Sequence, residues 1–224
     1  MIKNVIFDLD GTLLDTSKGI LDSVRYTIAA LNYSELSYEE LLTFVGPPIQ
    51  LSFMRHFGCD AETAQRATDI FRNYYKNFAL LRAIPYEGIY DLCYELKNRG
   101  MKLAVATYKR EDYALTLLQH FKFDKYCNPM YGADGNNQLK KKDIVRMCML
   151  EMGATPDNTV LVGDTEHDAL GAIEAGVAFL AVTYGFGFRG GADLNGYNYI
   201  GVADQPKEVA DILLSEQVVK RTNG

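Results

Sequence analysis

The stretch Val5-Ile6-Phe7-Asp8-Leu9-Asp10-Gly11-Thr12-Leu13-Leu14-Asp15-Thr16 decides how this 224-residue chain folds. Its first part, the apolar run Val5–Phe7, predicts a buried strand that ends abruptly at acidic residues. Asp8 and Asp10 are two residues apart, so in an extended chain both carboxylates lie on one face. Gly11 lets the backbone bend directly after them.

This acid pair favours particular chemistry. Two crowded carboxylates repel each other unless a cation lies between them, which suggests a hard divalent metal with oxygen ligands. The pair also suits a division of roles, in which one carboxylate is an ionised nucleophile and its neighbour carries a proton. Asp and Gly are common in turns, however, so the D-x-D pattern alone describes an ordinary turn after a strand equally well.

The composition is that of a globular protein. Hydrophobic residues make up 48% and charged residues 23% of the chain, which suits one α/β domain, or one domain with a modest insertion. The net charge of −6 provides no general attraction for nucleic acid, so an anionic substrate needs local positive charge. Four scattered cysteines without a C-x-x-C pattern predict reduced thiols. We expect a cytoplasmic protein with no signal peptide and no contact with a membrane.

Residues 16–83 have helical patterns only. A capping box, Ser37 with Glu40, opens one of the expected helices, and Thr16 or Ser17 is expected to cap the first. The helices are predicted at 20–31, 37–42, 49–57 and 60–81. We therefore predict an all-helical domain at 16–83, inserted into a second domain made of 1–15 and 84–224.

Strand and helix patterns alternate from residue 84 onward. Strands are expected at 103–107, 126–131, 159–162 and 177–183, with a Gly/Asn loop at 132–137 and a short helix near the C-terminus. Such alternation predicts an α/β fold with a doubly wound parallel sheet covered by helices on both faces. Ligands bind these sheets beyond the carboxyl ends of the strands. Asp8, Thr107 and Asp164 each end a predicted strand, so we expect them to lie close together.

The segment Gly163-Asp164-Thr165-Glu166-His167-Asp168 adds two carboxylates four residues apart. If a helix begins here, the carboxylates share a face. Asp164 is read as a site residue because it ends an apolar strand, whereas Asp168 is explained equally well by the preference of acids for helix N-termini. His167 is read as non-catalytic because Mg²⁺ prefers oxygen ligands.

A hydroxyl and a lysine run complete the set of candidates. The Thr107 hydroxyl can hydrogen-bond a phosphoryl oxygen, although a β-branched residue is common in strands anyway. Lys140-Lys141-Lys142 precedes a helix, where positive charge is unfavourable for the helix dipole. One of these lysines could neutralise a phosphoryl group, although a charge run usually forms a solvated face.

The order of these motifs resembles that of the haloacid dehalogenase-like superfamily over essentially the whole chain, and the insertion resembles that superfamily's helical cap. The segments 46–48, 106–109 and 183–187 resemble its phosphoglycolate phosphatase-like branch. That branch commonly has Thr-Ser-Lys-Pro where this chain has Thr107-Tyr108-Lys109-Arg110, so the contacts to phosphate are expected to differ there. Lys141 matches the superfamily's lysine best, with Lys140 and Lys142 left open.

The resemblance implies a Rossmann-like core and a Mg²⁺-dependent phosphatase acting on a small phosphomonoester, phosphoglycolate- or nucleotide-like. Asp8 would form an aspartyl phosphate, and Asp10 would protonate the leaving oxygen and then activate water. The implied metal ligands are Asp8, Asp10 through its backbone carbonyl, Asp164 and Asp168. The implied contacts to the phosphoryl group come from Thr107, Tyr108 and Lys141, whose charge also makes it a catalytic residue.

Two other functions fit the same residues. One is transfer of the phosphoryl group to a sugar, as in β-phosphoglucomutase. The other is a non-enzymatic phospho-acceptor module like a response-regulator receiver, but those are much shorter and lack a helical insertion. The second carboxylate at Asp10 also favours turnover over storage. The expected partner is a small phosphorylated metabolite, and the expected state is a monomer or homodimer.

Overall fold

A computed structural model of the chain describes residues 1–135 and 138–215. The described chain divides into two compact units. One combines Met1–Leu14 with the chain from Pro85 onward, and the other is Asp15–Ile84. The predicted junctions, after residue 15 and before residue 84, differ from these by one residue each. The short strands β2 (Leu14–Asp15) and β3 (Ile84–Pro85) pair where the chain passes from one unit to the other.

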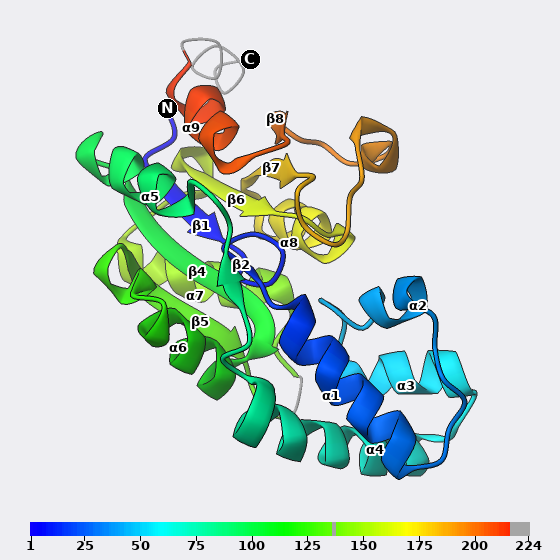
Figure 1. The fold of residues 1–224 in the computed structure, drawn as a ribbon. Coiled ribbons are helices and arrows are strands. Elements are labelled where there is room, and N and C mark those ends of the chain that lie inside the picture. The colour runs from blue at the N-terminus through cyan, green and yellow to red at the C-terminus, as the bar shows by residue number, and fades with distance from the viewer. Residues whose placement is uncertain (136–137, 216–224) are drawn as a thin grey trace. The chain divides into compact units, whose positions relative to one another are not determined.

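The first unit is built on a parallel sheet, which has six strands within the described residues, in the order β5-β4-β1-β6-β7-β8 (Figure 1). The register of the sheet places Phe7 opposite both Val105 and Val162. The chain positions that directly follow these residues therefore meet at one edge of the sheet. The strands are β1 (Asn4–Phe7), β4 (Lys102–Arg110), β5 (Cys127–Ala133), β6 (Thr159–Gly163), β7 (Ala178–Val182) and β8 (Gly201–Ala203).

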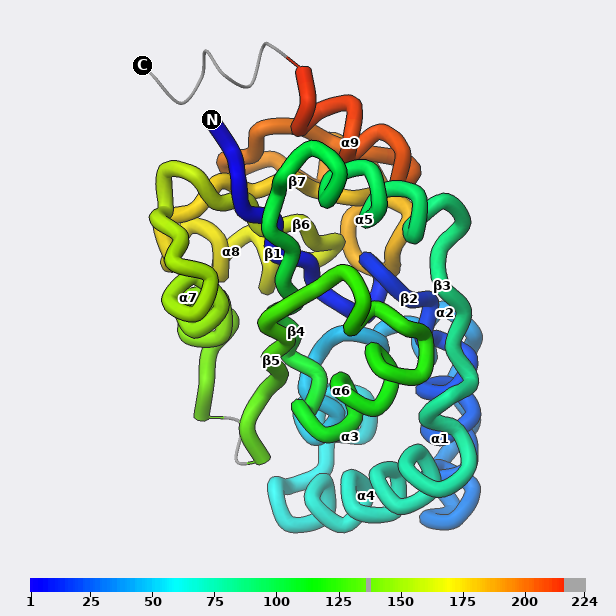
Figure 2. The backbone as a smooth tube through the Cα atoms, turned by 90° about the vertical axis from the view of Figure 1, so that its left-hand side faces the viewer, coloured from blue at the N-terminus to red at the C-terminus, as the bar shows by residue number. Residues whose placement is uncertain are grey.

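Helices cover both faces of this sheet (Figure 2). One face carries α7 (Lys141–Met152) and α8 (Glu166–Ala175), and the other carries α5 (Ile89–Asn98), α6 (Glu111–His120) and α9 (Pro206–Leu214). Every residue of β1 is buried, and its run Val5–Phe7 is continuously apolar rather than alternating. Alternate residues of the strands, such as Ile6, Ala104 and Leu161, pack into a core with α7 and α8. The predicted α/β fold with a doubly wound parallel sheet is confirmed.

The second unit is helical. It contains α1 (Ser17–Ala30), α2 (Tyr38–Leu42), α3 (Ile49–Phe57) and α4 (Ala61–Tyr74), followed by a π-helical turn, Tyr75–Ala79. Apolar and aromatic side chains of these helices, including Val24, Phe53 and Phe71, form its buried core. The Ser37–Glu40 capping box is present, with the Ser37 N–H donating to the Glu40 carboxylate at 2.8 Å.

Several element boundaries differ from the sequence prediction. Thr16 is the N-cap residue of α1, as expected, but its side chain makes no capping hydrogen bond. The Asp15 carboxylate instead accepts from both the N–H and the hydroxyl of Ser17. The helix expected to reach residue 81 ends at Tyr74 and is followed by a π-helical turn. The sequence did not predict this change, because the spacing of apolar residues does not distinguish i+4 from i+5 hydrogen bonding. β5 extends into the predicted 132–137 loop as far as Ala133, and 136–137 lie outside the described residues.

Two further observations concern membrane-spanning helices and the cysteine side chains. No helix in the described parts of the chain is both long and apolar enough to cross a membrane. The four cysteines all lie within the described ranges and have free thiols, and Cys93, Cys127 and Cys148 are buried.

Candidate active site

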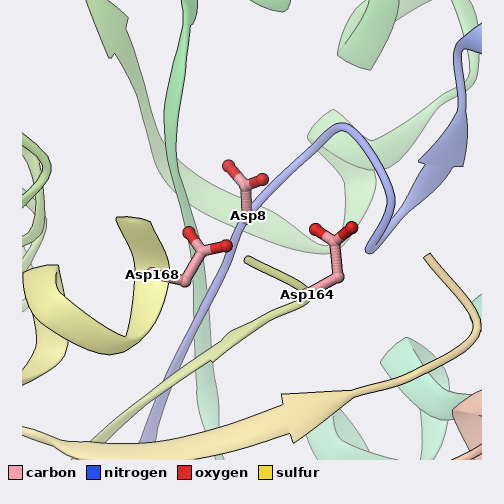
Figure 3. Close-up of side chains that lie close together, drawn as sticks. All are labelled: Asp8, Asp164 and Asp168. Carbon is pink, nitrogen blue, oxygen red and sulfur yellow. The ribbon is translucent and has the colours of Figure 1, made fainter. Parts of the chain in front are cut away.

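Three aspartates from distant parts of the sequence converge at the carboxyl edge of the sheet (Figure 3). Asp8 follows β1, Asp164 follows β6, and Asp168 lies in the first turn of α8. One carboxylate oxygen of each lies within 4.8 Å of the others, and all three side chains are buried. The structure therefore brings together the side chains of three of the four acids that the sequence singled out. We call them the aspartate cluster.

Lys141, the first residue of α7, reaches into this cluster. Its Nζ lies 2.6 Å from Asp8 Oδ1 and 2.6 Å from Asp168 Oδ1, and the residue is only 2% exposed. Lys140 is exposed at the start of the helix, and Lys142 pairs with Glu174 on the surface at 3.1 Å. Of the three lysines that the sequence left open, Lys141 is thus the one that lies in the site.

The electrostatics of the cluster are those of a site with too much negative charge. Burial raises the pKa of Asp8 to about 6, the Lys141 ammonium opposes this shift, and the Asp168 carboxylate adds to it. Burial also raises the pKa of Asp164 well above its usual range, and the neighbouring carboxylates add to the shift. Burial lowers the pKa of Lys141, but the Asp168 and Asp8 charges outweigh this and raise it. Lys141 therefore remains cationic, but it pairs with only two of the three acids, Asp8 and Asp168.

Backbone N–H groups bind only one of the two carboxylate oxygens of Asp164. Its Oδ2 accepts hydrogen bonds from the N–H groups of Phe186 at 2.7 Å and Gly187 at 3.2 Å. Its Oδ1 is buried and has no hydrogen-bond partner within the described chain. Gly11 permits this close packing: its φ is +81°, and a Cβ there would lie 2.2 Å from Asp164 Oδ2. A buried oxygen without a partner is costly unless something unseen, such as a cation, contacts it.

Asp168 has two functions in the local structure. Its Oδ2 accepts hydrogen bonds from the Thr165 N–H at 3.0 Å and the Thr165 hydroxyl at 2.7 Å, which fixes the start of α8. Its Oδ1 faces Lys141. The two interpretations of Asp168 from sequence, a helix-start acid and a site residue, are therefore compatible.

Asp10 has a different partner from Asp8. Its carboxylate pairs with Lys109, whose Nζ lies 3.0 Å from both oxygens. Thr107 is buried at the same end of β4, and its hydroxyl accepts a hydrogen bond from the Lys109 N–H at 3.2 Å. The Tyr108 ring centroid lies 5.9 Å from the Lys141 Nζ. Its ring also packs edge-on against His167, with the centroids 5.5 Å apart.

Comparison with known proteins agrees with this geometry. The haloacid dehalogenase-like hydrolase family matches residues 5–182, a range that contains the aspartate cluster and Lys141. The chain belongs to this family. The resemblance stated from the sequence motifs is confirmed.

Two relatives of the chain carry the names of phosphate-releasing enzymes. A 5'-nucleotidase of Pseudomonas aeruginosa is 35% identical over 185 residues, which are 82% of this chain and 84% of the relative. A pyrophosphatase PpaX of Halalkalibacterium halodurans is 30% identical over 184 residues, with 82% and 84% covered. The structure of a "predicted phosphatase" from Clostridium acetobutylicum is similar, with a TM-score of 0.87 and 34% identity over 96% of this chain and 99% of that one.

Membership of the haloacid dehalogenase-like hydrolases fixes the class of protein. The chain is an enzyme, and its expected class, a phosphoric monoester hydrolase, is confirmed at the level of the family. The non-enzymatic phospho-acceptor module is therefore disfavoured, since neither that class nor its architecture matches the chain.

Sequence reasoning missed three contributors to this hydrolase site. Lys109 is one residue of the Thr107–Arg110 segment, and its sequence context alone does not separate it from a solvated lysine at a strand end. The backbone donors of 186–187 carry no side-chain signal at all. Gly171 carries no side-chain signal either, but a Cβ there would lie 2.5 Å from Lys141 Cγ. Because Gly171 has no side chain, the aliphatic part of the Lys141 side chain can pack against α8.

Proposed function

We propose that this chain is a Mg²⁺-dependent phosphatase that hydrolyses a small phosphomonoester through an aspartyl phosphate on Asp8. The observation that carries the proposal is the buried aspartate cluster with Lys141 between two of its members. Such an arrangement binds and neutralises a phosphoryl group while it presents a carboxylate as nucleophile.

The donor set fits Mg²⁺. Carboxylate oxygens are the ligands that hard divalent cations prefer, and Asp164 Oδ1 is a buried oxygen without a hydrogen-bond partner in the described chain. Asp8, Asp164 and Asp168 would hold the ion, with the Asp10 backbone carbonyl as a further oxygen ligand. When bound, Mg²⁺ supplies positive charge that offsets the charge of the phosphoryl group.

The chain's own residues account for the proton and bond changes. The Asp8 carboxylate attacks phosphorus and the bond to the leaving oxygen breaks, while Asp10 donates a proton to that oxygen. Water then gives a proton to Asp10 and attacks the phosphoryl group, so that the bond to Asp8 breaks and phosphate is released. Lys141 offsets charge in both steps. We assign contacts with the phosphoryl oxygens to the Thr107 hydroxyl and to Tyr108, whose ring centroid lies 5.9 Å from the Lys141 Nζ.

The substrate is proposed as a class rather than a compound. Relatives are named for a nucleotide substrate and for pyrophosphate, which share a terminal phosphoryl group. We therefore propose a small phosphorylated metabolite, phosphoglycolate- or nucleotide-like.

Phosphate release tests this proposal directly. Purified protein is incubated with p-nitrophenyl phosphate, phosphoglycolate, nucleoside monophosphates and pyrophosphate, with Mg²⁺ or with a chelator. We expect Mg²⁺-dependent release from at least one monoester. Acid-quenched protein should carry a phosphoryl group on a peptide containing Asp8, detected by mass spectrometry. Asp8→Asn should lower turnover by roughly 10⁴-fold or more, because no nucleophile remains.

A matched control separates the nucleophile from a general loss of charge. Asp157→Asn changes an exposed aspartate and should leave release unchanged. Full activity in Asp8→Asn, or release that is equal with Mg²⁺ and with chelator, would contradict the mechanism. Turnover that requires an added sugar bisphosphate would instead favour phosphoryl transfer of the phosphoglucomutase type.

A further inference from the structure

Asp10 has an ammonium group of its own. Lys109 Nζ is equidistant from the two oxygens of its carboxylate, at 3.0 Å. The two side chains are only 7% and 9% exposed, so water screens their attraction weakly. A shielded pair of this geometry restrains the direction of the carboxylate far more than an exposed pair does.

The two acids of the D-x-D pair are served by different lysines on different elements. Asp8 pairs with Lys141 from the start of α7, whereas Asp10 pairs with Lys109 near the end of β4. β4 lies beside β1 in the sheet, with Val105 opposite Phe7, so the end of β4 runs past the turn that carries Asp10. The pairing draws the Asp10 carboxylate toward β4, while the Asp8 carboxylate faces Asp164 and Asp168.

We infer that Lys109 is a positioning residue that keeps the Asp10 carboxylate apart from the aspartate cluster. The inference rests on the proposed function, in which Asp10 passes a proton to the leaving oxygen. A carboxylate oxygen that ligates the metal ion is not available to the leaving oxygen. By holding Asp10 toward β4, Lys109 leaves the cation to the cluster and the leaving oxygen to Asp10.

The inference predicts a leaving-group signature. If Lys109 acts through Asp10, its loss affects esters whose leaving oxygen needs a proton, and it spares esters whose leaving group departs as a stable anion. Phenyl phosphate and p-nitrophenyl phosphate form such a pair, since p-nitrophenolate is the much more stable anion. A lysine that simply contacts the phosphoryl group would affect both esters equally, because their phosphoryl groups are identical.

The experiment measures kcat/KM for both esters, with saturating Mg²⁺, in the wild type and in Lys109→Met. We expect kcat/KM to fall roughly 100-fold for phenyl phosphate and less than about 10-fold for p-nitrophenyl phosphate, within the range of general acid catalysis. Lys109→Arg should restore most of the loss, since a guanidinium pairs well with a carboxylate. Lys142→Met removes a surface lysine paired with Glu174 and should leave the ratio of the two rates unchanged.

A double-mutant comparison isolates the action through Asp10. Asp10→Asn should show the same leaving-group signature, and adding Lys109→Met to it should lower kcat/KM no further. Because Lys109→Met removes an ammonium group from beside a shielded carboxylate, which destabilises a fold, Lys109→Gln is measured alongside and should show the same signature in weaker form.

Equal losses for the two esters, no loss for either, or additive losses in the double variant would each overturn the role of Lys109 while leaving the proposed phosphatase intact. A wild-type protein that releases no phosphate from any ester would instead reject the proposed function, and this inference with it.

Discussion

Replacing Asp8 with asparagine should stabilise the metal-free protein, and the gain should grow as pH rises. Burial raises the pKa of Asp8 from an ordinary value of 3.8 to about 6. This difference of about two pKa units corresponds to about 3 kcal/mol. Because the folded pKa lies above the unfolded one, the full stability is present below pH 3.8 and is lost as pH rises through about 6.

Asparagine keeps the shape of the side chain but cannot ionise, so the variant escapes this loss. Lys141 retains Asp168 as its partner in the variant. The difference in unfolding free energy between Asp8→Asn and the wild type should therefore increase by about 3 kcal/mol between about pH 4 and about pH 8. In a chain of this size such a difference corresponds to roughly 6–12 °C in Tm.

The assay is urea unfolding in the presence of a chelator, followed by circular dichroism because the chain contains no tryptophan. Asp157→Asn, at an exposed position, serves as the control and should show no growing difference. Adding Mg²⁺ at the higher pH should stabilise the wild type by mass action and the variant less. A difference between Asp8→Asn and wild type that is constant across pH would refute the reasoning.

Three further predictions concern the same site. Lys141→Met should lower phosphate release by roughly 10²–10³-fold, as for the loss of one group that stabilises developing charge; an unchanged rate would remove Lys141 from the mechanism. Gly171→Ala should lower kcat in a protein that still folds, because its Cβ would lie 2.5 Å from Lys141 Cγ, whereas Gly190→Ala, with open space around it, should not. Chelation should abolish turnover, and Mg²⁺ should restore it better than Ca²⁺, which favours more ligands and longer distances; recovery with Ca²⁺ alone would point to a different ion.

The acids of the site could be predicted because their positions follow from topology. An apolar strand that ends in Asp8, and another that ends in Asp164, must deliver their carboxylates to one edge if the sheet is parallel. Asp168 was less certain from sequence, since a helix-start acid explains it fully, and in the structure one of its oxygens does cap α8.

The positions of the site lysines could not be derived from the sequence pattern in the same way. Choosing among Lys140, Lys141 and Lys142 requires the first residue of α7, and helix boundaries cannot be fixed to one residue from spacing. Only the structure places Lys141 at that first position, where Gly171 leaves room for its stem. Lys109 was missed because a charged residue at a strand end normally faces solvent, and only the three-dimensional approach of β4 to the turn after β1 pairs it with Asp10.

The central place of β1 in the sheet has a consequence for how the molecule is made. β1 lies between β4 and β6, whose first residues are Lys102 and Thr159. During synthesis Asp8 and Asp10 leave the ribosome before β4 and β6 do, yet their strand cannot be enclosed until β6 has emerged. The helical unit Asp15–Ile84 is continuous in sequence and rich in local contacts, which form quickly. We therefore expect the helical unit to fold first and the nucleophile to be buried last, so a ribosome-bound chain that ends before Thr159 should leave Asp8 open to water.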